Sequence, residues 1–155
     1  MKLTQYTDLG LRLMMYLALR PSEPVTIQEV SERLAISKNH LVKISHQLTK
    51  SGLIASTRGR NGGIRLASAA EDITIEQVIK VTEESFGLVE CFNDGQNRCT
   101  LVGACKLADV LDAALDAFFD VLRKTTLAEL VENGAALEKM LLPVSGVNRV
   151  GSVAG

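Results

Sequence analysis

Two short helical patterns, separated by a break of about three or four residues, constrain the fold most strongly. Thr26 opens the first with a Thr-x-x-Glu capping box to Glu29, and apolar residues follow at helical spacing to position 34. Ser37 can cap the second, which buries an apolar stripe and ends at Gly52. Two helices joined so closely, the second with a polar and basic outer face, are typical of a helix-turn-helix.

The pattern then changes from helix to strand. Residues 53–58 and 64–67 read as two short strands, and the glycines of residues 59–63 suit a tight connection between them. A helix over residues 9–19 comes before the pair, with Thr7 or Asp8 as its cap, and another helix begins at Thr74 with a second capping box. We therefore predict a mainly α fold, a winged helix-turn-helix domain over residues 1–84 with a small β-hairpin wing.

The charge is unevenly distributed. The net charge is −1, yet residues 37–66 hold six lysines or arginines and no acid. A merely solvated face is the simpler explanation, but the basic residues fall where a winged helix meets a polyanion. The second helix would face the major groove, and Arg60 at the wing tip would suit a narrow minor groove. The residues expected to contact DNA are Ser37, Lys38, Asn39, His40, Lys43, Arg58, Arg60 and Asn61.

All three cysteines lie within a loop predicted over residues 85–106, at positions Cys91, Cys99 and Cys105. Their odd number argues against a disulfide framework, and their clustering favours a metal site over three small buried hydrophobes. The spacing lacks the close pair usual for zinc and better suits an iron-sulfur cluster. Because His40 and His46 lie on the expected DNA face, the fourth ligand is left as a carboxylate, another oxygen donor, water or a small ligand.

A long helix is expected over residues 101–124. Its apolar stripe, Leu107, Leu111, Ala114, Leu115, Phe118 and Leu122, is too wide for a solvated arm, and a homodimer would cover it. Folding back onto the chain's own domain is the alternative. The dimerisation region would span residues 101–142: a third capping box, Thr126 to Glu129, opens a short helix closed by Asn133 and Gly134, and residues 135–142 add further helical turns. Residues 143–155 are expected to be a disordered tail.

Several classes of protein are disfavoured. No secretory signal or membrane-length apolar run is visible, which predicts a cytoplasmic protein without a membrane partner. No nucleophile and base occur together near the cysteines, so we do not expect an enzyme.

The stretches LTQYTDLGLRLMMYLA, ISKNHLVKI and LTKSGLIASTRGRNGGIRLA, together with the three spaced cysteines, resemble the NsrR/IscR-like family of winged-helix iron-sulfur transcriptional regulators. The similarity covers residues 1–130. It implies a dimeric repressor whose [4Fe-4S] cluster permits binding to operator DNA and whose reaction with nitric oxide abolishes that binding. A [2Fe-2S] redox or cluster-status sensor of the same family, and a zinc-stabilised winged-helix interaction module, are the alternatives.

Within the family the sequence is more similar to the nitric-oxide-sensing members. Cluster-assembly regulators place a histidine ligand three residues after the last cysteine, where this chain has Ala108. Nitric-oxide-sensing members can use an aspartate of the other subunit, at the position of Asp8 here. The resemblance therefore implies Asp8 as fourth ligand. The seven residues between Cys91 and Cys99 exceed the five usual in the family, which leaves the cluster type open.

Overall fold

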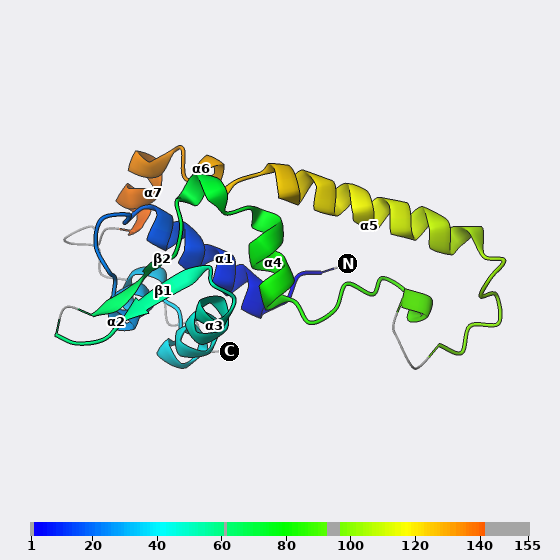
Figure 1. Cartoon of the computed structure of the whole chain (residues 1–155), viewed down its shortest axis with the longest axis horizontal. Helices are drawn as coiled ribbons and strands as arrows, with labels where there is room; N and C mark the ends of the chain where they lie inside the picture. The colour runs from blue at the N-terminus through cyan, green and yellow to red at the C-terminus, as the bar shows by residue number, and fades with distance from the viewer. Residues whose placement is uncertain (1, 61, 93–96, 142–155) are drawn as a thin grey trace, which may run out of the picture.

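A computed structural model describes residues 2–60, 62–92 and 97–141 (Figure 1). In chain order the elements are α1 (Gln5–Ala18), α2 (Ile27–Leu34), α3 (Lys38–Lys50), β1 (Ile54–Thr57), β2 (Gly63–Leu66), the 3-10 turn η1 (Ala70–Asp72), α4 (Ile75–Thr82), the 3-10 turn η2 (Glu90–Phe92), α5 (Lys106–Lys124), α6 (Leu127–Leu130) and α7 (Gly134–Leu141). The mainly α winged-helix fold is confirmed.

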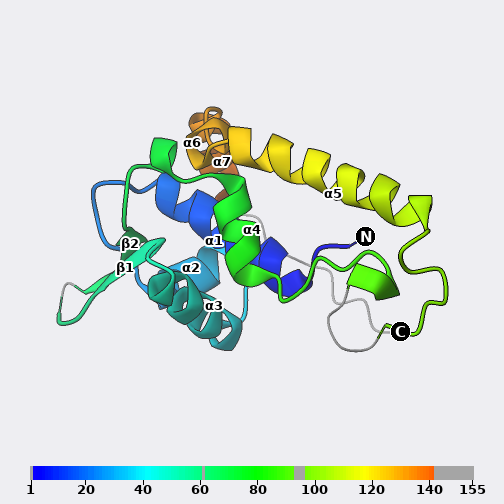
Figure 2. The same cartoon turned by 45° about the vertical axis from the view of Figure 1, so that its right-hand side comes forward.

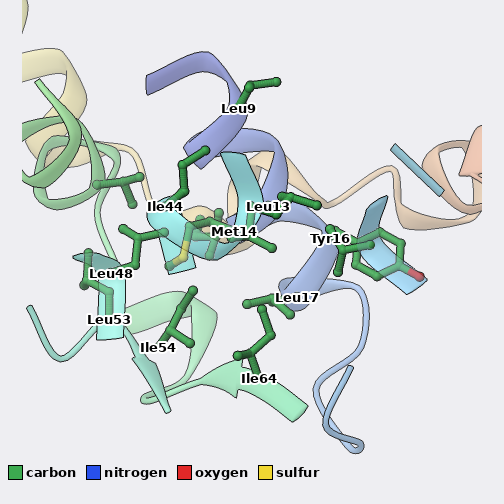
Figure 3. Close-up of a cluster of buried hydrophobic side chains, with 14 of the residues drawn as sticks. Leu9, Leu13, Met14, Tyr16, Leu17, Ile44, Leu48, Leu53, Ile54 and Ile64 are labelled. Atoms are coloured by element: carbon green, nitrogen blue, oxygen red, sulfur yellow. The ribbon is translucent and has the colours of Figure 1, made fainter. Parts of the chain in front are cut away.

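The core lies between α1, α3, α4 and the hairpin (Figure 3). Leu13 and Met14 of α1, Ile44 and Leu48 of α3, and Val78 of α4 are fully buried. Because α1 contacts α3, α4, β2 and α6, it is the central helix of the winged domain. A shift of α1 therefore affects the position of α3.

The hairpin is antiparallel, with Ile54 opposite Leu66 and Thr57 opposite Gly63. Val25, just before α2, exchanges two backbone hydrogen bonds of 2.9 Å with Ile64 of β2. A Cβ on Gly63 would lie 2.6 Å from the carbonyl oxygen of Val25, so only glycine permits this close approach. The wing is thus attached to the start of the helix-turn-helix.

The turn between α2 and α3 holds an unusual residue. Ala35 is the one non-glycine residue of the described chain with a positive φ, 53°, a left-handed conformation that favours glycine. The Ser31 hydroxyl donates a 2.7 Å hydrogen bond to the carbonyl of Ile36 and closes the turn. Ser37 precedes α3, but its side chain makes no capping hydrogen bond, contrary to expectation.

Two other helix starts differ from the sequence prediction. α1 begins at Gln5, and Thr4 is its cap, because the Thr4 hydroxyl accepts from the backbone N–H of Thr7. At α2, Thr26 caps the helix as predicted, but Glu29 does not return the bond. Its carboxylate instead accepts a 2.7 Å hydrogen bond from the hydroxyl of Tyr16 in α1. This tertiary contact replaces the second hydrogen bond of the predicted capping box.

The long helix α5 projects away from the winged domain (Figures 1 and 2). It begins at Lys106 and not at residue 101, because residues 100–104 form turns. Its carboxyl end is fixed to the domain by backbone hydrogen bonds from Ile75 to Thr125 (3.0 Å) and from Leu127 to Ile73 (2.7 Å). The cysteine-bearing segment consequently lies toward the opposite, amino-terminal end of α5.

Side-chain contacts also join α5 to α4 and to the segment that follows α4. Arg123 donates two 3.1 Å hydrogen bonds to the carboxylate of Glu76, and the Lys80 ammonium lies 2.8 Å from the same group. Arg123 and then Lys80 hold the pKa of Glu76 below its ordinary value. Phe86, between α4 and the cysteines, packs edge-on against Phe119 with ring centroids 4.8 Å apart.

After α5 the capping box of Thr126 and Glu129 starts α6 as predicted. Gly134 does not close a helix: it begins α7, whose Glu138 forms a 2.7 Å ion pair with Arg20 of α1. The predicted tail over residues 143–155 lies outside the described residues. No helix in the described part of the chain is long and apolar enough to cross a membrane.

Candidate nucleic-acid interface and thiol site

The first turns of α3 present the side chains that the sequence analysis assigned to DNA. Ser37, Lys38, Asn39, His40 and Lys43 are all exposed. On the opposite side of α3, Leu41, Ile44 and Leu48 are buried in the core, so the orientation of the polar face follows from packing. These donors are suited to phosphates and base edges.

The wing adds two cations. Arg58 and Arg60 are exposed in the connection between β1 and β2. Gly59 has a φ of +111°, and the backbone N–H of Gly62 donates a 2.9 Å hydrogen bond to its carbonyl, which shapes the turn. Asn61, also expected to contact DNA, lies outside the described residues.

Val42, an exposed residue of α3, was not among the DNA contacts expected from the sequence. It is 50% exposed, between Lys38 and His46 along the helix. A signal was available, because residues four apart share a helix face and both of those neighbours face outward.

Gln47, near the end of α3, is exposed but engaged. Its amide oxygen accepts a 2.8 Å hydrogen bond from the Tyr6 hydroxyl of α1, and its amide nitrogen donates to the carbonyl of Val81 in α4. Two residues later, Glu83 accepts from the backbone N–H of Thr4 (2.6 Å) and from its hydroxyl (3.0 Å). These contacts join the amino terminus of α1, the end of α3 and the segment that leads to the cysteines. No local sequence signal marks this joint.

The three cysteines line one open cleft of about 390 Å³ at the amino terminus of α5. All three are free thiols and half-buried. Cys105 is the residue just before α5, and Lys106 also lines the cleft. Residues 93–96 of the intervening loop lie outside the described part of the chain. Segments separated in the sequence are therefore brought to one site.

The donor set of this cleft fits an iron-sulfur cluster, which is held by thiolates. The amino terminus of a helix and a lysine both favour negative charge, as bound thiolates require. Among the described residues no group of three or more potential ligand side chains is close enough to hold a single metal ion.

Asp8 does not line the cleft of its own chain. It lies exposed in the first turn of α1 and forms a 2.8 Å ion pair with Arg12.

The apolar residues of α5 divide into two faces, where the sequence analysis expected one stripe. Leu111, Leu115, Phe118 and Leu122 are half-buried. A second face is exposed and spaced alternately three and four residues apart; we call it the α5 stripe, consisting of Leu107, Val110, Ala114, Ala117 and Val121. This spacing is that of a helix seam that packs against another helix.

The fold and the two sites define a winged-helix protein with a thiol-lined site at the amino-terminal end of a helical arm, away from the winged domain. Residues 3–133 match the model of the Rrf2 family, described as an iron-dependent transcriptional regulator. The chain belongs to the Rrf2 family, a family of transcriptional regulators and not of enzymes.

Relatives and solved structures agree with this assignment. The chain is 47% identical to the HTH-type transcriptional regulator NsrR of Bacillus licheniformis, over 91% of this chain and 99% of the relative. The NsrR of Bacillus subtilis is 45% identical over 91% and 97%. The structure of CymR, the global cysteine regulator of B. subtilis, aligns with a TM-score of 0.70 at 26% identity over 86% of this chain and 98% of that one. T. potens IscR, at 24% identity and a TM-score of 0.71 over 89% and 91%, shares the fold.

Proposed function

We propose that the chain is a homodimeric transcriptional repressor that binds operator DNA when an iron-sulfur cluster, of the [4Fe-4S] type, is held by Cys91, Cys99 and Cys105, and that nitric oxide releases it. One observation carries the proposal: a basic recognition helix and a cleft lined by three free thiols occur in one chain of an iron-dependent regulator family. The relatives named NsrR support the assignment to a repressor.

The DNA-binding part rests on α3 and the wing. The exposed lysines of α3 neutralise phosphates, and release of counterions from the duplex makes such binding strong at low salt. Arg60 extends the contact to the minor groove. We expect Arg60→Ala to weaken operator binding while the iron content stays unchanged; equal affinity would contradict a wing contact.

The cluster-binding part rests on the three thiols and Asp8. A bound cluster supplies iron that reacts with nitric oxide. The cysteines would hold it at the amino terminus of α5, and the carboxylate of Asp8 from the second protomer would complete the ligand set. An oxygen donor among thiolates is the weakest ligand, since soft sulfur is the better partner of iron in such clusters. Before Asp8 can bind there, it has to exchange its ion pair with Arg12.

Coupling follows from the packing of α1. Asp8 lies one turn from Thr4, whose hydrogen bonds to Glu83 are part of the joint that also holds Gln47 of α3. A ligand bond to Asp8 therefore restrains the helix on which the position of α3 depends. In the dimer this restraint sets the separation of two recognition helices, roughly 34 Å for adjacent major grooves. Only different affinities of the two states for DNA make this a switch.

The deciding experiment measures operator affinity at one fixed salt concentration for anaerobically purified protein, for the iron-free protein and for protein treated with stoichiometric nitric oxide. Tight binding by the first alone is expected. Equal affinity in all three states would refute the sensor and leave a DNA-binding protein. Iron, zinc and inorganic sulfide analysis distinguishes the zinc-stabilised module, and Mössbauer spectra distinguish a [2Fe-2S] sensor.

The ligands are tested separately. We expect Cys99→Ala to lose iron and sulfide, because the cleft keeps only two thiols. Full cluster content in this variant would count against ligation by Cys99. For Asp8→Ala we expect a cluster that is more labile or altered in its visible spectrum, with Arg12→Ala as the control that removes only the ion-pair partner. If the cluster of the Asp8→Ala protein has the spectrum and the lifetime of the wild-type cluster, Asp8 is not a ligand and serves only to stabilise the first turn of α1.

A further inference from the structure

We propose that Val42 is a specificity residue, which recognises the 5-methyl group of a thymine in the major groove of the operator. This inference rests on the proposed function, because it requires α3 to enter the major groove. It goes further by assigning a base to one side chain.

The position of Val42 suits a base contact. It is the fifth residue of α3, and recognition helices contact base edges with their amino-terminal turns. Lys38 and Asn39, one turn before it, and His46, one turn after it, are exposed on neighbouring positions. Val42 thus lies inside the polar surface expected to contact DNA and not at its edge.

Its exposure is exceptional within the winged domain. In residues 2–60 and 62–92, every other valine, isoleucine, leucine, methionine or aromatic side chain is buried or half-buried, whereas Val42 is 50% exposed. A single exposed valine is common in proteins and carries little by itself. On the exposed face of α3 it is the one large apolar side chain among hydrogen-bond donors. A β-branched residue is also a poor helix former at a solvated position.

The chemistry of the major groove assigns the partner. Valine offers no hydrogen bond, so at an adenine, guanine or cytosine edge it would displace water and leave donors or acceptors unpaired. Thymine alone presents a methyl group there. The stiff side chain of valine holds its own methyl groups in place with little loss of rotamer freedom. Lys38 and Lys43 suit phosphates, which carry no sequence information, whereas Val42 would select a base.

The test removes the methyl group from the DNA. A tight-binding duplex is first selected from a random pool with the anaerobically purified full chain, and each of its thymines is then replaced singly by deoxyuridine. Affinities are measured at one salt concentration for wild type and Val42→Ala. In each half-site we expect one thymine whose replacement by deoxyuridine weakens wild-type binding about fourfold, because one buried methyl contact is lost. Replacing both of these thymines in one duplex should weaken binding about 15-fold.

For Val42→Ala we expect the same thymine to be replaceable with little change in affinity. Lys43→Ala is the matched control: it should weaken binding to all duplexes and reduce the salt dependence, but keep the preference for thymine over uracil. Because Val42 is exposed and alanine is the better helix former, its replacement should not lower the thermal unfolding midpoint.

The outcomes separate the two proposals. Wild type that binds every deoxyuridine duplex as tightly as the parent overturns the role of Val42 and leaves DNA binding intact. The same holds if Val42→Ala retains the full preference for thymine. If no duplex is selected from the pool at all, the proposed function fails, and this inference fails with it.

Discussion

The exposed α5 stripe should determine whether the chain dimerises. The change to make is Val110→Asp, the second of the five residues of the stripe. Leu107, Val110 and Val121 are between 61% and 64% exposed in the single chain. Full burial of such a side chain contributes about 1.5–3 kcal/mol, so covering the exposed part of each contributes about 1–2 kcal/mol.

In a symmetric dimer each position occurs twice. Three side chains on each of two helices then contribute about 6–12 kcal/mol before the cost of association is subtracted. Replacing both copies of Val110 removes about 2–4 kcal/mol and places two carboxylates in an apolar seam. The dimer dissociation constant should therefore rise by about 100-fold or more.

Sedimentation equilibrium of the iron-free, reduced protein over a wide concentration range measures this constant without any contribution from a bound cluster. Val110→Ala should weaken the dimer by a smaller factor. Asp112→Ala is the control on the same helix, because Asp112 is exposed outside the stripe. A Val110→Asp protein that dimerises as tightly as wild type, or an equal effect of Asp112→Ala, would refute the stripe as the dimer seam.

Three further changes test the rest of the fold. Ala35→Gly should stabilise the protein by about 0.5 kcal/mol, because glycine avoids a left-handed strain of about 1–2 kcal/mol but has a more disordered unfolded chain; urea unfolding measures it. Gln47→Ala should lower stability by about 1–2 kcal/mol and narrow the difference in DNA affinity between iron-loaded and iron-free protein. Arg123 lowers the pKa of Glu76, so the Glu76 carboxylate should stabilise the fold fully above pH about 4.3, its pKa in the unfolded chain, and progressively less as pH falls through its pKa in the folded protein. The Glu76→Gln variant should lack this contribution.

A different result would refute each of these three predictions. A lower unfolding midpoint for Ala35→Gly would mean that the side chain of Ala35 matters more than the strain. For the joint, Tyr6→Phe removes one of the two hydrogen bonds of Gln47 and should give an intermediate effect; wild-type behaviour of Gln47→Ala would remove the joint from the coupling. If Glu76→Gln and wild type lose stability in parallel on acidification, the titration of other groups explains the acid sensitivity.

Much of the winged domain was predictable because its signals are local. The spacing of Leu41, Ile44 and Leu48 specifies which side of α3 is buried, and therefore which side is free for a ligand. The capping residues at Thr74 and Thr126 mark helix starts by hydrogen bonds that span three residues. The three cysteines indicated one site through residue type and proximity along the chain.

What only the tertiary structure decided involves partners far apart in the sequence. The sequence of α5 shows apolar residues at helical spacing, but not that Phe119 packs against Phe86 while Leu107 and Val110 remain uncovered. The side chain of Glu29 accepts a hydrogen bond from Tyr16 instead of capping α2, and Gln47 bonds to residues of α1 and α4. Periodicity identifies the side of an element that avoids water, whereas the neighbour that covers it depends on how the whole chain packs.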